Sequence, residues 1–118
     1  PLTKFEVDGA LSLLGAVVNY FDVVEWPSGT LHMGNRTYLR ININYTAGVA
    51  INYFDPGIRI GQLLFIEKYG SPYNLVIREL ADNNIRMPGT SFTLSDNDNC
   101  TFIWNGFTWN MLSKMNND

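Results

Sequence analysis

The sequence predicts an all-β protein whose short antiparallel strands pack as a β-sandwich or barrel-like domain. Turn residues, chiefly Gly, Pro, Asn and Asp, recur about every ten positions, a spacing typical of such folds. Two similar octapeptides, GAVVNYFD at 15–22 and GVAINYFD at 48–55, each begin at a glycine and continue in β-favouring residues. An Asn-Gly pair at 105–106 lies between two β-rich runs, which is a strong hairpin signal. A chain of 118 residues suits one compact core.

Composition excludes several classes of protein. Charged residues make up 16 %, hydrophobic residues 46 %, and the formal net charge is −3, so we expect an ordered chain without the basic field that attracts nucleic acid. The apolar run at 10–18 is about half of the roughly 20 residues that cross a bilayer, so no membrane insertion is expected. The first residues carry no Met and no signal-peptide pattern, which indicates a processed or excised piece of a protein.

Residues 1–30 are predicted to form a β-hairpin neck. With Gly15 in a three-residue turn, Leu11 pairs with Val17 on an apolar face, and the opposite face is also apolar near the turn. Because both faces need cover, we expect neighbouring subunits to supply it, so this segment is predicted to join copies of the chain in an obligate homo-oligomer ahead of a tip domain at 31–118. The alternative is a sandwich in which this hairpin is a central layer.

Residues 37–55 predict a second hairpin, with Gly48 as the left-handed residue of a three-residue loop. That loop sets Ile43 opposite Ile51 and gathers the apolar residues on one face, whereas a two-residue loop would mix the two faces. The register itself therefore favours this hairpin.

The middle of the chain carries two Pro-Gly pairs, at 56–57 and 88–89. Each predicts a type II turn, in which proline fixes φ at the first central position and glycine accepts a positive φ at the second. Between them, residues 71–84 fit either of two structures: Ser71 and the spacing of the apolar residues allow a short helix, while Val76 and Ile77 favour a strand.

The segment 101–112 predicts a hairpin closed by a two-residue turn. This register pairs Trp104 with Phe107 and Phe102 with Trp109, so one face is almost wholly aromatic. Such a face is either a stacking platform for sugars or part of the core, and we favour the core.

No catalytic or metal-binding constellation is predicted, so we expect no enzyme activity and no cofactor. Cys100 lies on the aromatic face and is predicted to be a buried thiol. The single histidine, His32, could bind a metal if a threefold axis joined three copies. The run at 96–99 lacks the Gly and the distal Glu of a calcium loop and predicts a plain polar turn. The charged pairs at 67–68 and 78–79 are predicted to be solvated strand edges.

From residue 37 to 112 the chain resembles a β-rich module of bacteriophage tail fibres, tailspikes and related contractile injection systems. The stretch GIRIGQLLFIEKYGSPYNLVIREL is similar to the module's Gly-Gln entry into an apolar strand, polar turn and second strand. NNIRMPGTSFTLSDNDNCTFIWNGFTWNML is similar to its later turns and terminal aromatic strand, and KFEVDGALSLLG at 4–15 resembles stretches that build fibre necks. The resemblance implies a strand at 74–80, a homotrimer, and an extracellular place on the virion tail fibre.

We therefore predict a non-enzymatic virion tail-fibre tip domain that attaches to a host cell-surface glycan or protein receptor. Three aromatic residues beside turn-forming Pro or Gly, Trp26, Tyr69 and Tyr73, are the predicted ligand contacts, because a rigid ring can stack on a sugar. Each ring can instead fill the end of the domain. The alternative function is a monomeric carbohydrate-binding β-sandwich module.

Overall fold

The computed structural model describes residues 20–23, 29–33, 36–43, 49–70 and 72–117. These residues form strands and no helix, so the described part of the chain has no helix that could cross a membrane. The all-β prediction is confirmed. In chain order the strands are β1 (Tyr20–Val23), β2 (Thr30–Leu31), β3 (Tyr38–Ile41), β4 (Val49–Ile51), β5 (Tyr53–Phe54), β6 (Leu63–Lys68), β7 (Leu75–Arg78), β8 (Ile85–Arg86), β9 (Ser91–Leu94), β10 (Asn99–Trp104) and β11 (Trp109–Met115).

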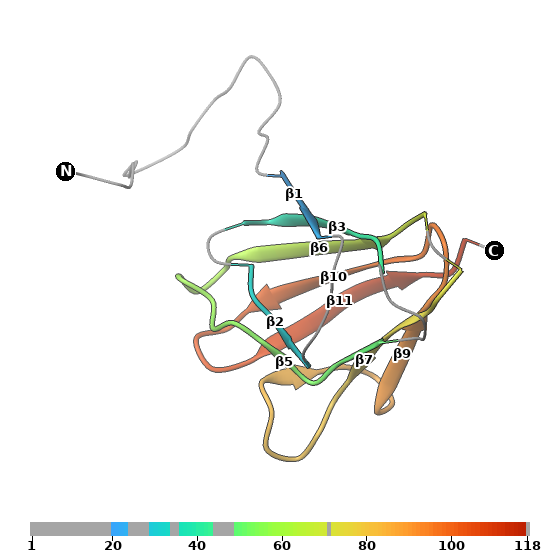
Figure 1. Cartoon of the computed structure of the whole chain (residues 1–118). Coiled ribbons are helices and arrows are strands. Elements are labelled where there is room, and N and C mark those ends of the chain that lie inside the picture. Colours follow the sequence, from blue (N-terminus) through green and yellow to red (C-terminus); the bar gives the residue numbers. More distant parts are fainter. Residues whose placement is uncertain (1–19, 24–28, 34–35, 44–48, 71, 118) are drawn as a thin grey trace.

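The strands form a sandwich of two layers (Figure 1). One layer is a six-stranded sheet with the order β1-β3-β6-β10-β11-β8. The other holds the three-stranded sheet β4-β7-β9 and the two-stranded pair β2-β5 (Figure 1). In the large sheet β3 runs parallel to both β1 and β6, whereas β10 runs antiparallel to both β6 and β11. The pairs β2–β5, β4–β7 and β8–β11 are also parallel, so the prediction of antiparallel strands is wrong for these pairs.

The core forms because side chains alternate between the two faces of each strand. In β6, Leu64 and Ile66 are buried while Leu63 and Phe65 are exposed, and β10 buries every second residue in the same way. Burying each such aliphatic or aromatic side chain contributes about 1.5–3 kcal/mol. Among the residues whose burial is described, the buried apolar ones are Leu31, Met33, Leu39, Ile41, Ile43, Ile51, Phe54, Leu64, Ile66, Leu75, Ile77, Ile85, Leu94, Cys100, Phe102, Trp104 and Trp109.

Aromatic rings join the two layers. Phe54 of β5 contacts Phe102 edge-on with ring centroids 5.1 Å apart, and contacts Trp109 in the same manner at 6.2 Å. The rings of Trp104 and Trp109 lie 5.3 Å apart. Phe102, Trp104 and Trp109 of the predicted aromatic face are therefore core, as predicted, whereas Phe107 is exposed.

The C-terminal hairpin itself is confirmed, but its predicted register is wrong by two residues. Trp104 lies opposite Trp109 rather than Phe107, and the loop has four residues, 105–108. A type I′ turn needs a positive φ at both central residues, and among the described residues only Asn97 and four glycines have one, so Asn105 does not.

The predicted hairpin over 37–55 is wrong. β3 pairs with β1 and β6 in the large sheet, whereas β4 pairs with β7 in the opposite layer. Ile41 and Ile51 are both fully buried, so the two strands share an apolar face by meeting across the core. The same alternation of apolar residues occurs in a hairpin and in two strands that face each other across a core. The alternation therefore could not distinguish the two arrangements.

The first octapeptide and the N-terminal hairpin fall largely outside the described residues. Within residues 1–30 only β1, Gly29 and Thr30 are described, and β1 lies parallel to β3 at the edge of the large sheet. The second octapeptide supplies β4 and β5, so the Tyr-Phe pairs of both copies lie in strands. The division into a neck at 1–30 and a tip domain at 31–118 stays a prediction.

The two Pro-Gly turns differ. Gly89 has a φ of 72°, as a type II turn requires. Gly57 does not have a positive φ, so the type II prediction is wrong there. Gly57 is needed instead for space, because an added Cβ would lie 2.1 Å from Cγ of Trp104.

The segment 71–84 and the charged pair at 67–68 are both explained by strand positions. Residues 75–78 form β7, so of the two predicted structures, helix or strand, the strand is correct.

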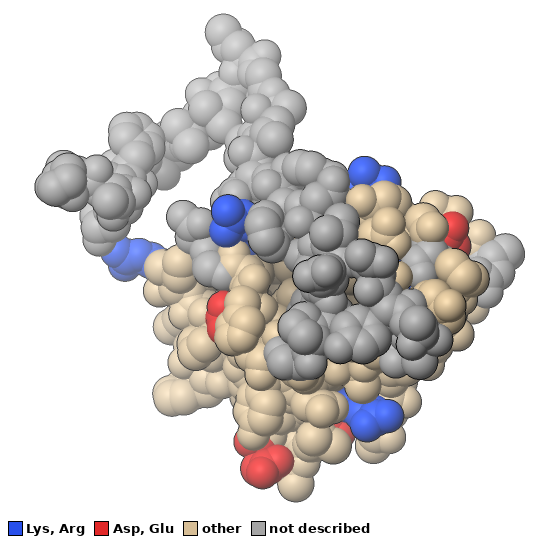
Figure 2. Space-filling model, viewed as in Figure 1, with Lys and Arg blue, Asp and Glu red and all other residues tan. Residues whose placement is uncertain are grey.

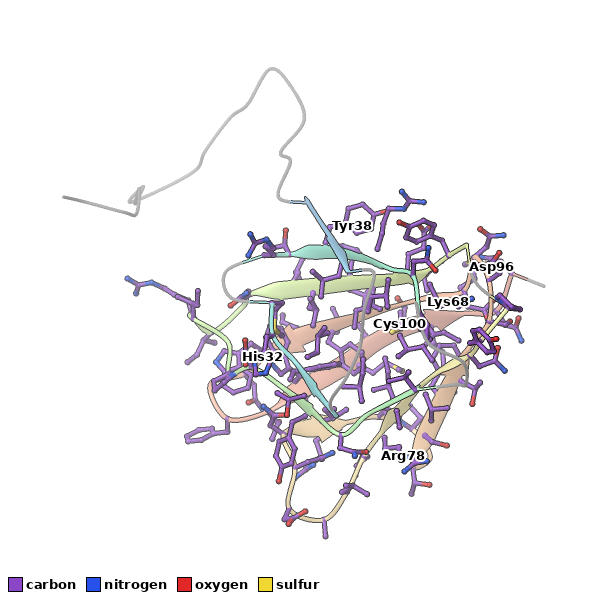
Figure 3. The ribbon with its side chains drawn as sticks, viewed as in Figure 1. His32, Tyr38, Lys68, Arg78, Asp96 and Cys100 are labelled. Atoms are coloured by element: carbon purple, nitrogen blue, oxygen red, sulfur yellow. The ribbon has the colours of Figure 1, made fainter. Side chains whose placement is uncertain are left out.

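Lys68 is not at a solvated edge, and that prediction is wrong: β6 lies in the middle of its sheet and the Lys68 side chain is fully buried. Its Nζ reaches Asp96 Oδ1 at 3.4 Å, at one end of the sandwich (Figure 3).

The run at 96–99 is a turn held by Asp98. The carboxylate of this buried residue accepts hydrogen bonds from the Ser95 N–H at 2.9 Å and from the Asn117 N–H at 2.7 Å. Burial by itself would raise the pKa of Asp98. Those bonds, with the Ser95 hydroxyl and the charge of Lys68, hold the pKa below its ordinary value of 3.8.

Asp98→Asn should lower the free energy of unfolding at neutral pH by about 1.5–3 kcal/mol, the usual contribution of hydrogen bonds to a charged group. The pKa of Asp98 is lower in the folded chain than in the unfolded one. Its contribution is therefore complete above the ordinary pKa of 3.8 and is lost as the pH falls through the folded pKa. Urea unfolding at a series of pH values, from neutral to strongly acid, measures both effects.

The matched control is Asp82→Asn, at an exposed turn position. It should leave the stability at neutral pH within about 0.5 kcal/mol of the original chain. If Asp98→Asn lost stability on acidification as steeply as the unaltered chain, the role given to Asp98 would be excluded.

Candidate functional site

One end of the sandwich presents two adjoining loops. Residues 55–62 join β5 to β6, and residues 105–108 join β10 to β11, at the same end of the two layers (Figure 1). The Trp104 carbonyl accepts the Gly61 N–H at 2.8 Å, and the Trp104 N–H donates to the Gln62 carbonyl at 2.9 Å. The first loop therefore extends the β6–β10 ladder and is fixed to the second at its base.

Amide side chains hold the backbone of both loops. Gln62 Oε1 accepts the Ile58 N–H at 2.7 Å. Asn105 Oδ1 accepts the N–H of Phe107 at 2.8 Å and that of Thr108 at 2.7 Å. A backbone fixed in this way loses little conformational entropy when its side chains bind a partner.

The side chains presented by these loops are large and apolar. Ile58, Ile60 and Phe107 are 61 %, 77 % and 84 % exposed, and we call these three residues the apolar tip. An added Cβ on Gly106 would lie 3.2 Å from Ile60 Cγ1, so the two loops touch at this point. Exposed apolar side chains gathered on a rigid surface are typical of a contact site.

Polar contacts fix the start of the first loop. The Asp55 carbonyl accepts the indole N–H of Trp109 at 2.9 Å, and Asp55 Oδ1 lies 2.9 Å from Nδ1 of His32. His32, the candidate metal ligand at a threefold axis, thus adjoins a carboxylate on the surface. Among the described residues no group of three or more His, Cys, Asp or Glu is placed to hold a metal ion.

Cys100 is a buried thiol, as predicted. Its side chain lies between the layers (Figure 3), and burial raises the pKa of the thiol far above its ordinary value. A protonated thiol without access to solvent is a poor nucleophile, so Cys100 has a packing role.

Two of the three predicted contact residues, Tyr69 and Tyr73, lie elsewhere. Trp26 is outside the described residues. Tyr69 follows the last residue of β6, at the end opposite the apolar tip, and its ring is covered by Arg40, whose Cζ is 3.8 Å from the ring centroid. Tyr73 is partly buried against the core. Their role in binding stays a prediction.

The apolar tip was missed for identifiable reasons. The predicted register put Phe107 opposite Trp104 on the core face, and the true loop releases it to solvent. Ile58 and Ile60 lie in the stretch PGIRIG, between two glycines. Apolar residues enclosed by turn residues were the signal that could have identified them.

Charge on one described face of the molecule is sparse and mixed. Figure 2 shows Lys and Arg separated from one another, with Asp and Glu between them, on a surface that is mostly uncharged. No single-sign field forms on the described part of this face. The arrangement favours contact through apolar and neutral polar groups over electrostatic attraction.

A comparison with protein-family models matches residues 24–110 to the phage depolymerase C-terminal beta sandwich domain. The match covers most of the 118 residues and includes β2 to β10 with both loops of the apolar tip. No curated protein shows a significant match to the chain.

Proposed function

Because the chain belongs to the family of phage depolymerase C-terminal β-sandwich domains, we propose that it is a non-catalytic domain of a virion tail protein that attaches to the host surface. The observation that carries the proposal is the apolar tip, whose three residues all lie within the matched segment. The extracellular virion tail is the location this function requires.

The proposed ligand is a host-surface saccharide. The exposed ring of Phe107 offers a flat apolar face to the C–H groups of a sugar ring, and the adjoining loop adds the exposed side chains of Ile58 and Ile60. One such contact is weak. In a homotrimer, three tips displayed on one particle convert weak contacts into stable attachment through effective concentration.

No residue of this chain is proposed to cleave polysaccharide. Purified protein incubated with bacterial capsular polysaccharides and lipopolysaccharides should release no reducing ends. Reproducible release of reducing ends would show that the domain is an enzyme and would overturn the non-catalytic part of the proposal, while leaving the binding part to be tested separately.

Phe107→Ala should reduce binding to host-surface saccharide at least about tenfold, the effect of losing about 1.4 kcal/mol at each site. Fluorescently labelled protein would be applied to a panel of bacterial strains and to immobilised bacterial surface polysaccharides. Because Phe107 is 84 % exposed, the variant should keep the thermal unfolding midpoint of the original chain.

The matched control is Leu80→Ala, an exposed apolar residue in the loop between β7 and β8. It should bind like the original chain. If Phe107→Ala also bound like the original chain to a strain or polysaccharide that the original chain retains, the apolar tip would be excluded as the receptor contact.

A further inference from the structure

The sequence holds a single Asn-Gly pair, and it opens the loop that carries Phe107. Asn105 is exposed, and Gly106 has no side chain to hinder a reaction at its backbone nitrogen. In such a pair the backbone nitrogen of the glycine can attack the amide carbon of the asparagine side chain and expel ammonia. The rate of this reaction depends on the geometry that the fold gives to the two residues.

The loop holds and polarises the side-chain carbonyl of Asn105. Oδ1 accepts the N–H of Phe107 at 2.8 Å and the N–H of Thr108 at 2.7 Å. Two backbone N–H donors at this distance from one oxygen are the arrangement that stabilises the negative charge of a tetrahedral intermediate in acyl transfer. Attack on Cγ of Asn105 would place that charge on Oδ1, where the two donors already point.

The attacking nitrogen and the leaving group are both unengaged. Because Oδ1 is bonded to the two residues after Gly106, the Asn105 side chain is folded forward over the peptide that joins it to Gly106. Among the described residues, none accepts a hydrogen bond from the Gly106 N–H or from Nδ2 of Asn105. The Gly106 nitrogen can therefore lose its proton, and ammonia can depart, without breaking a contact in the described part of the chain.

The reaction consumes water and needs no other reactant. A bond forms between the Gly106 nitrogen and Cγ of Asn105, and the bond from Cγ to Nδ2 breaks. The proton of the Gly106 nitrogen passes through water to Nδ2, which leaves as ammonia. Water then opens the resulting cyclic imide: opening at Cγ gives aspartate, and opening at the backbone carbonyl carbon gives isoaspartate.

We propose that Asn105 is a site of spontaneous deamidation, and that the folded hairpin accelerates the reaction. The nucleophile, the electrophilic carbon and the two oxyanion donors all belong to residues 105–108, which the hairpin holds together. The inference concerns the chemistry of this loop and does not depend on saccharide binding.

The products change the surface beside the apolar tip. An aspartate at position 105 accepts the same two N–H bonds, and these bonds are stronger to a charged acceptor, so this product keeps the loop in place. It adds a negative charge next to Phe107, in a loop whose residues 105–108 are all uncharged. Isoaspartate instead lengthens the backbone between Asn105 and Gly106 and displaces the donors.

The test follows the conversion of each asparagine in the full chain by peptide mapping and mass spectrometry. One sample is incubated folded in mildly alkaline buffer, and a second is incubated in urea that unfolds it, at the same pH and temperature. Asn105 should convert about tenfold faster in the folded sample, a small part of what an oxyanion donor contributes in enzymes. Asn110 is the internal control, because it lies in the same hairpin but is followed by Met111, and it should keep its amide.

Three results are distinguished. Faster conversion of Asn105 in the folded sample, with Asn110 unchanged, supports the inference. If Asn105 keeps its amide in the folded sample, or converts no faster there than in urea, the loop does not promote the reaction and the inference is overturned. If Asn110 converts as fast as Asn105, the reaction is not specific to the Asn-Gly pair and the assignment fails. None of these results bears on saccharide binding, which Phe107→Ala tests separately.

Discussion

Replacing Trp109 by alanine should lower the free energy of unfolding by about 3–5 kcal/mol, which is a large part of the stability of a small domain. Trp109 is fully buried, and its ring contacts those of Phe54 and Trp104, so it joins both layers of the sandwich. Its indole N–H also fixes the Asp55 carbonyl at 2.9 Å. Guanidinium unfolding followed by far-ultraviolet circular dichroism measures the loss.

Two further variants divide this effect into its parts. Trp109→Phe keeps an aromatic ring but leaves the Asp55 carbonyl without its indole donor, so we expect a smaller loss of about 1–3 kcal/mol. Phe107→Ala, in the same hairpin but on the surface, should change the stability by less than about 0.5 kcal/mol. A loss below about 1 kcal/mol for Trp109→Ala would contradict the view that this ring joins the layers.

The features predicted correctly are those set by near neighbours in the chain. Alternation along a strand decides which residues share a face, so Phe102, Trp104 and Cys100 were assigned to the core from the sequence alone. Turn residues at short intervals predicted the all-β class for the same local reason. Gly89 takes the positive φ that its turn demands.

The pairing of strands could not be predicted in the same way, because it depends on contacts between distant residues. β4 lies beside β7, which follows it by more than twenty residues, and β3 lies beside β6. A hairpin and two facing layers would each bury the apolar residues of 38–43 and those of 49–51. Local patterning therefore fixed the faces and left the topology open.

The sequence is rich in asparagine, but the sequence alone does not show what these residues do. Asn84 exchanges two hydrogen bonds with the backbone of Phe54, and the buried Asn83 donates to the carbonyls of Asn52 and Arg78. These amide side chains take the place of strand partners where the small sheets end. Which backbone groups lack a partner depends on the tertiary fold, so composition could not assign them.

The candidate site shows the same limit. Ile58 and Ile60 lie in a short stretch between two glycines, and whether such residues are buried or exposed depends on where the loop docks. The docking is decided by Trp104, which is distant in the sequence and bonds to the backbone of Gly61 and Gln62. The exposure of the apolar tip therefore follows from the long-range pairing of β6 with β10.

Gly57→Ala should lower the free energy of unfolding by about 3 kcal/mol, the upper part of the range for inserting a group into a packed core. The added methyl group would lie 2.1 Å from Cγ, 2.4 Å from Cδ1 and 2.6 Å from Cδ2 of the Trp104 ring. That ring packs on Trp109, so it cannot move without displacing the core or the loop that carries the apolar tip. Guanidinium unfolding and tryptophan fluorescence would show the loss together with a changed environment of Trp104.

Gly89→Ala separates this steric effect from backbone strain. Gly89 has a φ of 72° and nothing within 4 Å of an added Cβ, whereas Gly57 has no positive φ but no room. The Gly89 variant should therefore lose only about 1–2 kcal/mol, the cost of a left-handed conformation, and should leave the tryptophan spectrum unchanged. If the two variants had the same free energy of unfolding and both left the tryptophan fluorescence spectrum unchanged, the contact between Gly57 and Trp104 would not be what fixes the loop. The loop that carries the apolar tip would then be held by its backbone hydrogen bonds to Trp104 and by the side-chain amides of Gln62 and Asn105.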